Sequence, residues 1–244
     1  MSPVTHSVLD SRLADIVTED PRTAAVFDRL GLDYCCEGHR TLRDAAFDCH
    51  LAISDVVGEL SALGPQPDRD RDATRWQNLA DLMGHIVTDH HRYVREHAPI
   101  LKGWLDKLVA KHGVRHPELL EIRAVFETLA ADLLQHMAKE ENILFPYIEK
   151  LWRESEAGRM LPGSPFGTLA NPIRAMESDH EHAGALLKSL RTLTAGYQPP
   201  LDGCTTYRVC FAELARFEAD LHQHVHLENQ ILFPRAVALE ATAV

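Results

Sequence analysis

Two histidine–glutamate pairs are the residues of this chain best suited to chemistry, and both lie in a phrase that the sequence repeats. The phrases HMAKEENILFP and HVHLENQILFP begin at His136 and His224. In each, a glutamate follows the histidine by four residues, as Glu140 and Glu228. Side chains four residues apart leave one face of a helix, so each phrase offers an imidazole nitrogen and a carboxylate oxygen to neighbouring coordination positions.

Both pairs interrupt an apolar stripe with helical spacing, so their side chains are predicted to face a core. A buried carboxylate costs several kcal/mol unless it is paired or coordinates a cation, and two of them therefore indicate a metal site. The predicted stripes are Ile122, Phe126, Leu129, Leu133, Ile143 and Tyr147 around the first pair, and Cys210, Leu214, Phe217, Leu221 and Ile231 around the second.

Two further helical segments must complete such a site. In the helical segment of about 74–110, the stripe through His91 (Val87, Val94, Ala98, Leu101) is more uniformly apolar than the stripe through His90, which contains Tyr93 and His97. In the helical segment of about 170–195, His180 shares a face with Ile173, Met176, Leu187 and Leu190, whereas His182 does not. Four imidazoles and two carboxylates are too many ligands for one tetrahedral ion and suit two ions bridged by the glutamates. The predicted ligands are His91, His136, Glu140, His180, His224 and Glu228.

Other polar residues near these ligands are expected to play smaller parts. Glu177 and Asp179 lie close enough in sequence to reach the site, and a solvent-facing role is expected for Asp179. Pro146 and Pro234 are predicted to kink or end their helices. The remaining histidines of these segments are expected on a solvated face by default, with hydrogen bonding to the ligands as the alternative: His85, His90, His97, His182, His222 and His226.

The elements that position these residues are predicted to be helices throughout. Four long helical patterns cover about 74–110, 117–154, 170–195 and 203–240, and none shows the alternation of a strand. They predict an all-α fold with an antiparallel four-helix bundle. The first 62 residues indicate a small domain of short helices, and 63–73 a linker. The predicted domains are therefore 1–62 and 74–244.

Composition limits the partners of the chain. The net charge of −11 disfavours nucleic acid and anionic membranes. No apolar run approaches the roughly 20 residues of a membrane span, and the first residues do not resemble a signal peptide, so a cytoplasmic location is expected. The five cysteines do not suggest a disulfide framework. A homodimer through the N-terminal domain is compatible with the sequence, although no apolar stripe requires one.

The repeated phrases, together with MESDHEHAG and DYCCEGHRTL, resemble those of the repair-of-iron-centres (RIC) family, whose bundle is hemerythrin-like. The resemblance implies two non-haem iron ions, bridged by oxide or hydroxide, on the same six ligands. It also implies repair of iron–sulfur clusters in proteins damaged by nitric oxide or peroxide, through iron donation, reductive removal of nitric oxide, or both. Whether the chain is an enzyme, as a nitric oxide reductase would be, stays open.

Alternatives exist for both candidate sites. The runner-up function is a carrier or sensor that binds oxygen or nitric oxide reversibly, and a structural zinc site is a third reading. The adjacent thiols of Cys35 and Cys36 are redox or nitrosyl-accepting candidates, or small buried residues. In this turn Glu37 replaces the first glycine of the family's usual Asp-Tyr-Cys-Cys-Gly-Gly.

Overall fold

The structure, a computed structural model, describes residues 8–64, 76–160 and 163–241. The chain divides into two compact units. Unit 1 contains Met1–Leu82 and His222–Arg235, and unit 2 contains Met83–Leu221 and Ala236–Val244. Most of the predicted linker, 63–73, lies outside the described residues, and the predicted domain boundaries stay predictions.

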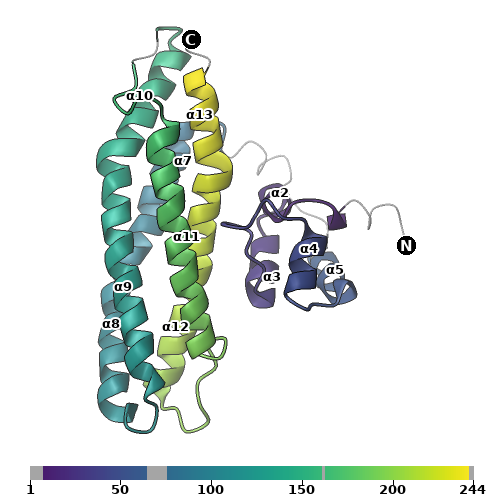
Figure 1. Ribbon diagram of the computed structural model, residues 1–244, viewed down its shortest axis with the longest axis vertical. Coiled ribbons are helices and arrows are strands. Elements are labelled where there is room, and N and C mark those ends of the chain that lie inside the picture. The colour runs from purple at the N-terminus through teal and green to yellow at the C-terminus, as the bar shows by residue number, and fades with distance from the viewer. Residues whose placement is uncertain (1–7, 65–75, 161–162, 242–244) are drawn as a thin grey trace. The chain divides into compact units, whose positions relative to one another are not determined.

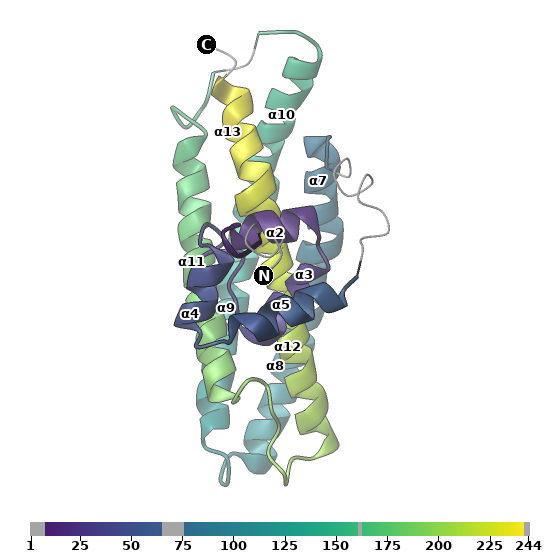
Figure 2. The ribbon, with the colours of Figure 1, turned by 90° about the vertical axis from the view of Figure 1, so that its right-hand side faces the viewer.

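The N-terminal part of unit 1 consists of short helices whose ends follow local sequence signals (Figure 2). One helix ends at Gly31, whose φ of 70° is the left-handed conformation that glycine adopts without strain. Another begins after Thr41, whose Oγ1 accepts a hydrogen bond from the Asp44 backbone N–H at 3.2 Å. These helices are α2 (Leu13–Glu19), α3 (Thr23–Leu30), α4 (Leu42–Asp48) and α5 (Ile53–Ala62).

Unit 2 is a bundle of long helices (Figure 1). Helix α9 packs against both α8 and α11. Within this unit, Phe217 of α12 contacts Tyr93 of α8 and Phe126 of α9 through its ring. Over the described ranges the only β pairing is an isolated bridge between Arg12 and Thr41, so the predicted all-α class is confirmed. The main helices are α8 (Arg92–His112), α9 (Glu118–Lys139), α11 (Ala170–Leu193) and α12 (Thr205–His226).

Three of the four long segments contain a π-helical turn beside a predicted ligand. In a π-helix the hydrogen bonds run from residue i to i+5, which inserts one residue relative to an α-helix and is frequent at functional sites. The segments are α7 (Leu79–His85), η1 (Ile86–His91) and α8; α9, η2 (Glu140–Leu144) and α10 (Phe145–Glu156); and α12, η3 (Leu227–Leu232) and α13 (Phe233–Ala241).

These π turns correct the predicted stripes at one end of each. Ile143 was expected in the core but is 53% exposed, and Leu144 is buried in its place. Ile231 is likewise half-buried while Leu232 is buried. On the first segment, Ile86 rather than Val87 is fully buried. The physical reason is the inserted residue, which rotates the following turn by about 100° relative to a constant 3.6-residue period.

The two prolines of the repeated phrase do not end their helical runs. Pro146 is the second residue of α10 and Pro234 the second residue of α13. Each follows directly on a π turn, where the missing proline N–H falls in the first turn of the new α-helical register. Of the two predicted effects, an end of the helix does not occur, and a kink stays a prediction.

Candidate metal centre

The predicted ligands lie at fixed points of the long helices. His91 is the last residue of η1, and Glu140 is the first residue of η2, four residues after His136 of α9. His180 lies in the middle of α11. His224 lies near the end of α12, and Glu228 lies in η3. All six side chains are buried.

The structure brings the ligand atoms of these six residues together in two overlapping groups. One group consists of His91, Glu140, His224 and Glu228. The other consists of His136, Glu140, His180 and Glu228. Within each group all the ligand atoms lie within 4.8 Å of one another. Each group therefore contains two histidines of its own, and both groups share the two glutamates.

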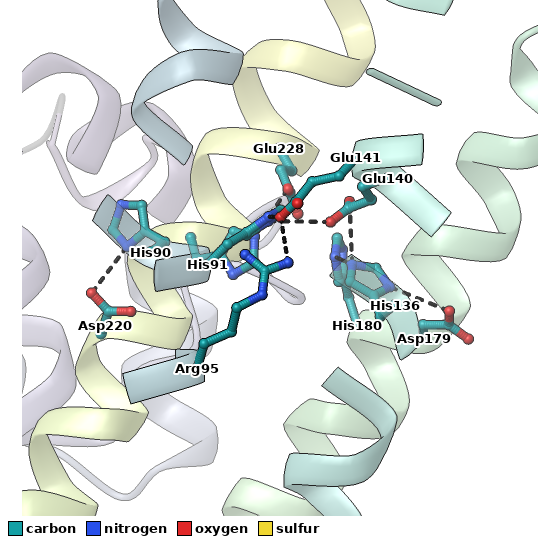
Figure 3. Close-up of polar contacts among 11 residues, drawn as sticks. His90, His91, Arg95, His136, Glu140, Glu141, Asp179, His180, Asp220 and Glu228 are labelled. Atoms are coloured by element: carbon teal, nitrogen blue, oxygen red, sulfur yellow. Dashed lines mark hydrogen bonds and ion pairs between the residues drawn. The ribbon is translucent and has the colours of Figure 1, made fainter. Parts of the chain in front are cut away.

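The imidazoles present Nε2 to this cluster (Figure 3). Nε2 of His91 lies 3.4 Å from Oε2 of Glu140, and Nε2 of His136 lies 3.2 Å from Oε1 of the same carboxylate. Nε2 of His224 lies 3.0 Å from Oε1 of Glu228. One carboxylate thus faces a histidine from each group, as a bridging ligand must.

The donor atoms fit a cation. Glu140 is fully buried, and neither of its oxygens has a hydrogen-bond partner among the described residues. Nε2 of His136 and Nε2 of His180 lie 3.0 Å apart, and two imidazole nitrogens about 2.1 Å from one ion and at right angles are also about 3.0 Å apart. Buried carboxylate oxygens beside converging imidazoles are compensated by a divalent ion.

Two carboxylates outside the cluster orient its histidines. Oε1 of Glu141 lies 2.6 Å from Nδ1 of His91 and also accepts a 2.7 Å hydrogen bond from Arg95. Burial acts to raise the pKa of Glu141, but Arg95 and His91 outweigh it and hold the pKa below its ordinary value. A carboxylate at Nδ1 fixes the tautomer of a metal-ligating histidine with its Nε2 lone pair turned inward.

Asp179 does the same for His136. Its Oδ2 lies 3.2 Å from Nδ1 of His136 and 2.9 Å from Nζ of Lys139. Here too burial acts to raise the pKa of the carboxyl, and the hydrogen bonds from Lys139 and His136 hold it below its ordinary value. Asp179 therefore reaches the site, the alternative to the solvent-facing role expected for it, although its side chain is still 39% exposed. The sequence signal was its position directly before His180, which did not specify the direction of its side chain.

Two of the histidines expected on a solvated face, His90 and His226, are buried instead. His90 is 5% exposed and pairs with Asp220 at 3.0 Å, and His97 pairs with Glu213 at 2.7 Å. Burial lowers the pKa of His226 to about 4. The default of a solvated face holds for His182, whose side chain is 60% exposed, and fails for His90 and His226. The acidic partners of His90 and His97 lie far away in sequence, so the linear pattern did not reveal them.

The two adjacent cysteines lie in the turn after α3. Cys35 is buried and Cys36 is partly exposed, with their Sγ atoms 3.8 Å apart and no disulfide between them. The contact with Cys36, burial and the charge of Asp33 all raise the pKa of the Cys35 thiol. Glu37, which replaces the first glycine of the family's usual turn, does not have the positive φ that favours glycine. The next residue, Gly38, is the position that needs glycine, because a Cβ there would overlap the carbonyl oxygen of Tyr34.

A helical bundle that surrounds buried histidines and glutamates defines a cation-binding protein of the hemerythrin type. Residues 82–236 match the hemerythrin HHE cation binding domain, and residues 9–64 match a second family, a domain of unknown function (DUF542). The iron-sulfur cluster repair protein ScdA of Staphylococcus haemolyticus is 30% identical over 224 residues, which cover 92% of this chain and 96% of the relative.

Two proteins named YtfE are similar at comparable levels. The iron-sulfur cluster repair protein YtfE of Musicola paradisiaca is 35% identical over 232 residues, covering 95% of this chain and 98% of the relative. YtfE of Escherichia coli O81 is 33% identical over 234 residues with the same coverage. The chain belongs to this ScdA/YtfE family of hemerythrin-domain proteins, and the resemblance inferred from its sequence is confirmed. Within the described ranges, none of the helices combines the length and apolar character needed to span a bilayer.

Proposed function

We propose that this protein holds two iron ions and repairs iron–sulfur clusters damaged by nitrosative or oxidative stress. The observation that carries the proposal is the composition of the two ligand groups. Each contains two histidines of its own and both glutamates, Glu140 and Glu228. Two ions with two imidazoles each and two shared carboxylates account for every member of the cluster.

The protein's own residues prepare the site for these ions. Glu141 and Asp179 fix the orientation of His91 and His136, which keeps the Nε2 lone pairs directed at the ions. Phe145 stacks on His91 with ring centroids 5.9 Å apart and, with the apolar stripes, limits water at the site. When bound, two iron ions supply one-electron chemistry, positions at which nitric oxide or oxygen can bind, and ferrous iron that can be released.

The choice of iron rests on relatives whose names state iron–sulfur cluster repair. Nitrogen and oxygen donors also suit manganese or zinc, and affinity alone would favour zinc over ferrous iron. The same relatives favour repair over reversible gas binding as the function. We place the protein in the cytoplasm, with damaged iron–sulfur proteins as its partners.

The test is transfer of iron to a damaged client. The 57Fe-loaded ferrous protein is mixed with an apo-ferredoxin, sulfide and a slow chelator, and cluster formation is followed by absorption and by the isotope recovered in the ferredoxin. Repair by iron donation predicts labelled clusters from the wild type and none beyond background from a Glu140→Ala, Glu228→Ala variant. Iron that stays with the protein throughout would contradict iron donation.

Reductive removal of nitric oxide is the second route, and it has its own readout. The fully reduced protein is exposed to nitric oxide without another electron source, and nitrous oxide is measured in the headspace. About one nitrous oxide per two ferrous ions is expected, because joining two nitric oxide molecules with loss of one oxygen consumes two electrons. A stable complex that releases unchanged gas on degassing would instead support the carrier or sensor alternative.

A further inference from the structure

A second group of metal-ligating side chains lies in the turn after α3. Carboxylate and thiol atoms of Asp33, Cys35 and Cys36 all lie within 4.8 Å of one another. None of the three belongs to the histidine–glutamate cluster. We propose that they bind one divalent transition-metal ion such as Fe2+, through two thiolates and one carboxylate oxygen.

The backbone of the turn holds both thiols in place for an ion. Oδ1 of Asp33 accepts hydrogen bonds from the backbone N–H groups of Cys35 at 3.1 Å and Cys36 at 2.8 Å. These bonds close the turn with the two side chains near the same carboxylate. Oδ1 of Asp33 also lies 3.2 Å from Sγ of Cys35, so the carboxylate stands beside the thiols as the third ligand.

The separation of the sulfur atoms fits shared coordination. Sγ of Cys35 and Sγ of Cys36 are 3.8 Å apart. Two thiolates about 2.3 Å from one ion, at the tetrahedral angle, are also about 3.8 Å apart. A disulfide would instead require a separation of about 2.0 Å. The two sulfurs can therefore bind an ion with little movement.

The type and number of donors indicate which ion binds and how it enters. Thiolates select Fe2+, Zn2+ and similar ions over Mg2+ or Ca2+. Three protein ligands leave the fourth tetrahedral position open, and Cys36 is partly exposed, so the ion remains reachable from solution. Each thiol releases its proton to solvent on binding, and no electron is transferred.

The turn is also connected to the segment that carries Glu228. Within unit 1, Nε2 of Gln230 in η3 donates a hydrogen bond of 3.3 Å to the carbonyl oxygen of Cys35. An ion on the thiols would therefore lie beside a segment whose glutamate the proposed function assigns to the two irons. The thiolate site itself does not depend on that function and is tested separately from it.

The test is a Co2+ titration of the reduced full-length protein, followed by near-ultraviolet absorption. Thiolate ligands give an intense sulfur-to-cobalt charge-transfer band that imidazole and carboxylate ligands do not give. The wild type is expected to show a saturable band with one cobalt per chain on thiols. Cys36→Ser should remove at least half of the band, because the band grows with the number of bound thiolates.

Two matched variants complete the test. Asp33→Asn keeps an oxygen that accepts the backbone N–H groups but loses the anionic ligand, so it should keep the band and weaken cobalt binding at least about tenfold. Cys49→Ser, which removes an exposed thiol of the same unit, should change neither. Absence of a band when the thiols are shown to be reduced, an unchanged band in Cys36→Ser, or unchanged affinity in Asp33→Asn would each overturn the three-ligand site.

Discussion

Oε1 of Glu141 lies 2.6 Å from Nδ1 of His91, although the preceding residue, Glu140, faces the ligand cluster. The adjacent glutamates of the first repeated phrase thus serve two layers of one site, because neighbouring side chains diverge around a helix. In the second phrase Asn229 stands at the position of Glu141. The two halves of the proposed centre are therefore similar in their ligands and different in what supports them.

The first prediction concerns this supporting carboxylate. Glu141→Gln should lower Fe2+ affinity by about 10- to 100-fold, because the orienting carboxylate of a ligand histidine is lost. Competition with a coloured chelator measures the change. Glu127→Gln is the matched control, since Glu127 pairs with Lys102 away from the cluster. Equal affinities of the two variants would show that Glu141 does not support the site.

The second prediction concerns pH. The pKa of Asp179 is held below 3.8 in the folded protein. A lowered folded-state pKa stabilises the fold above the unfolded value, and this contribution is lost as the pH falls through the folded value. In metal-free protein, the difference in unfolding free energy between wild type and Asp179→Asn should therefore shrink below about pH 4. Urea denaturation at several pH values measures it, and a difference that stays constant into acid would contradict the assignment.

The third prediction tests the register of the π turn η2. Leu144→Ala should cost about 2–5 kcal/mol because it empties a buried position. Ile143→Ala should cost about 1 kcal/mol or less because the side chain is 53% exposed. Denaturant unfolding compares the two variants. A larger cost for Ile143→Ala than for Leu144→Ala would contradict the π turn and support the constant helical period that the sequence alone predicts.

The fourth prediction concerns sharing of the glutamates. Glu140→Ala should reduce bound iron from about two ions per chain toward none, because both groups lose a ligand. His180→Ala, which belongs to one group, should leave about one ion. Metal analysis after anaerobic loading and desalting distinguishes the two. Loss of a single ion in both variants would show that Glu140 is not shared.

The fifth prediction concerns the effect of Glu140 on the stability of the metal-free protein. Its buried carboxylate has no hydrogen-bond partner in the described part of the chain. Glu140→Gln removes a buried charge and should raise the melting temperature of the metal-free protein while lowering that of the loaded protein. A parallel decrease in both forms would mean that the carboxylate serves the fold rather than an ion.

The sequence was sufficient to find the residues that converge, because the histidines and glutamates interrupt apolar stripes that the structure buries. His136 and Glu140 illustrate this, since both follow directly on the buried stripe of α9. The four long segments were also predicted within a few residues. Periodicity and helix-end signals are local, so they can be recognised in a single sequence.

What the sequence did not predict depends on non-local geometry. The π turns move burial from Ile143 to Leu144, and no residue type marks such a turn in advance. Asp179 reaches His136 across 43 residues, and His90 reaches Asp220 across 130. These partners are chosen by helix packing, so a single sequence shows the residues without showing the pairs.

The central claim, that two irons share Glu140 and Glu228, is tested most directly by Mössbauer spectroscopy combined with metal analysis. Protein purified anaerobically from cells grown on 57Fe would be measured as isolated and after reduction. The account predicts about two irons per chain, with the oxidised pair antiferromagnetically coupled through its bridges. One iron with a magnetically isolated spectrum, or stoichiometric zinc in place of iron, would contradict it.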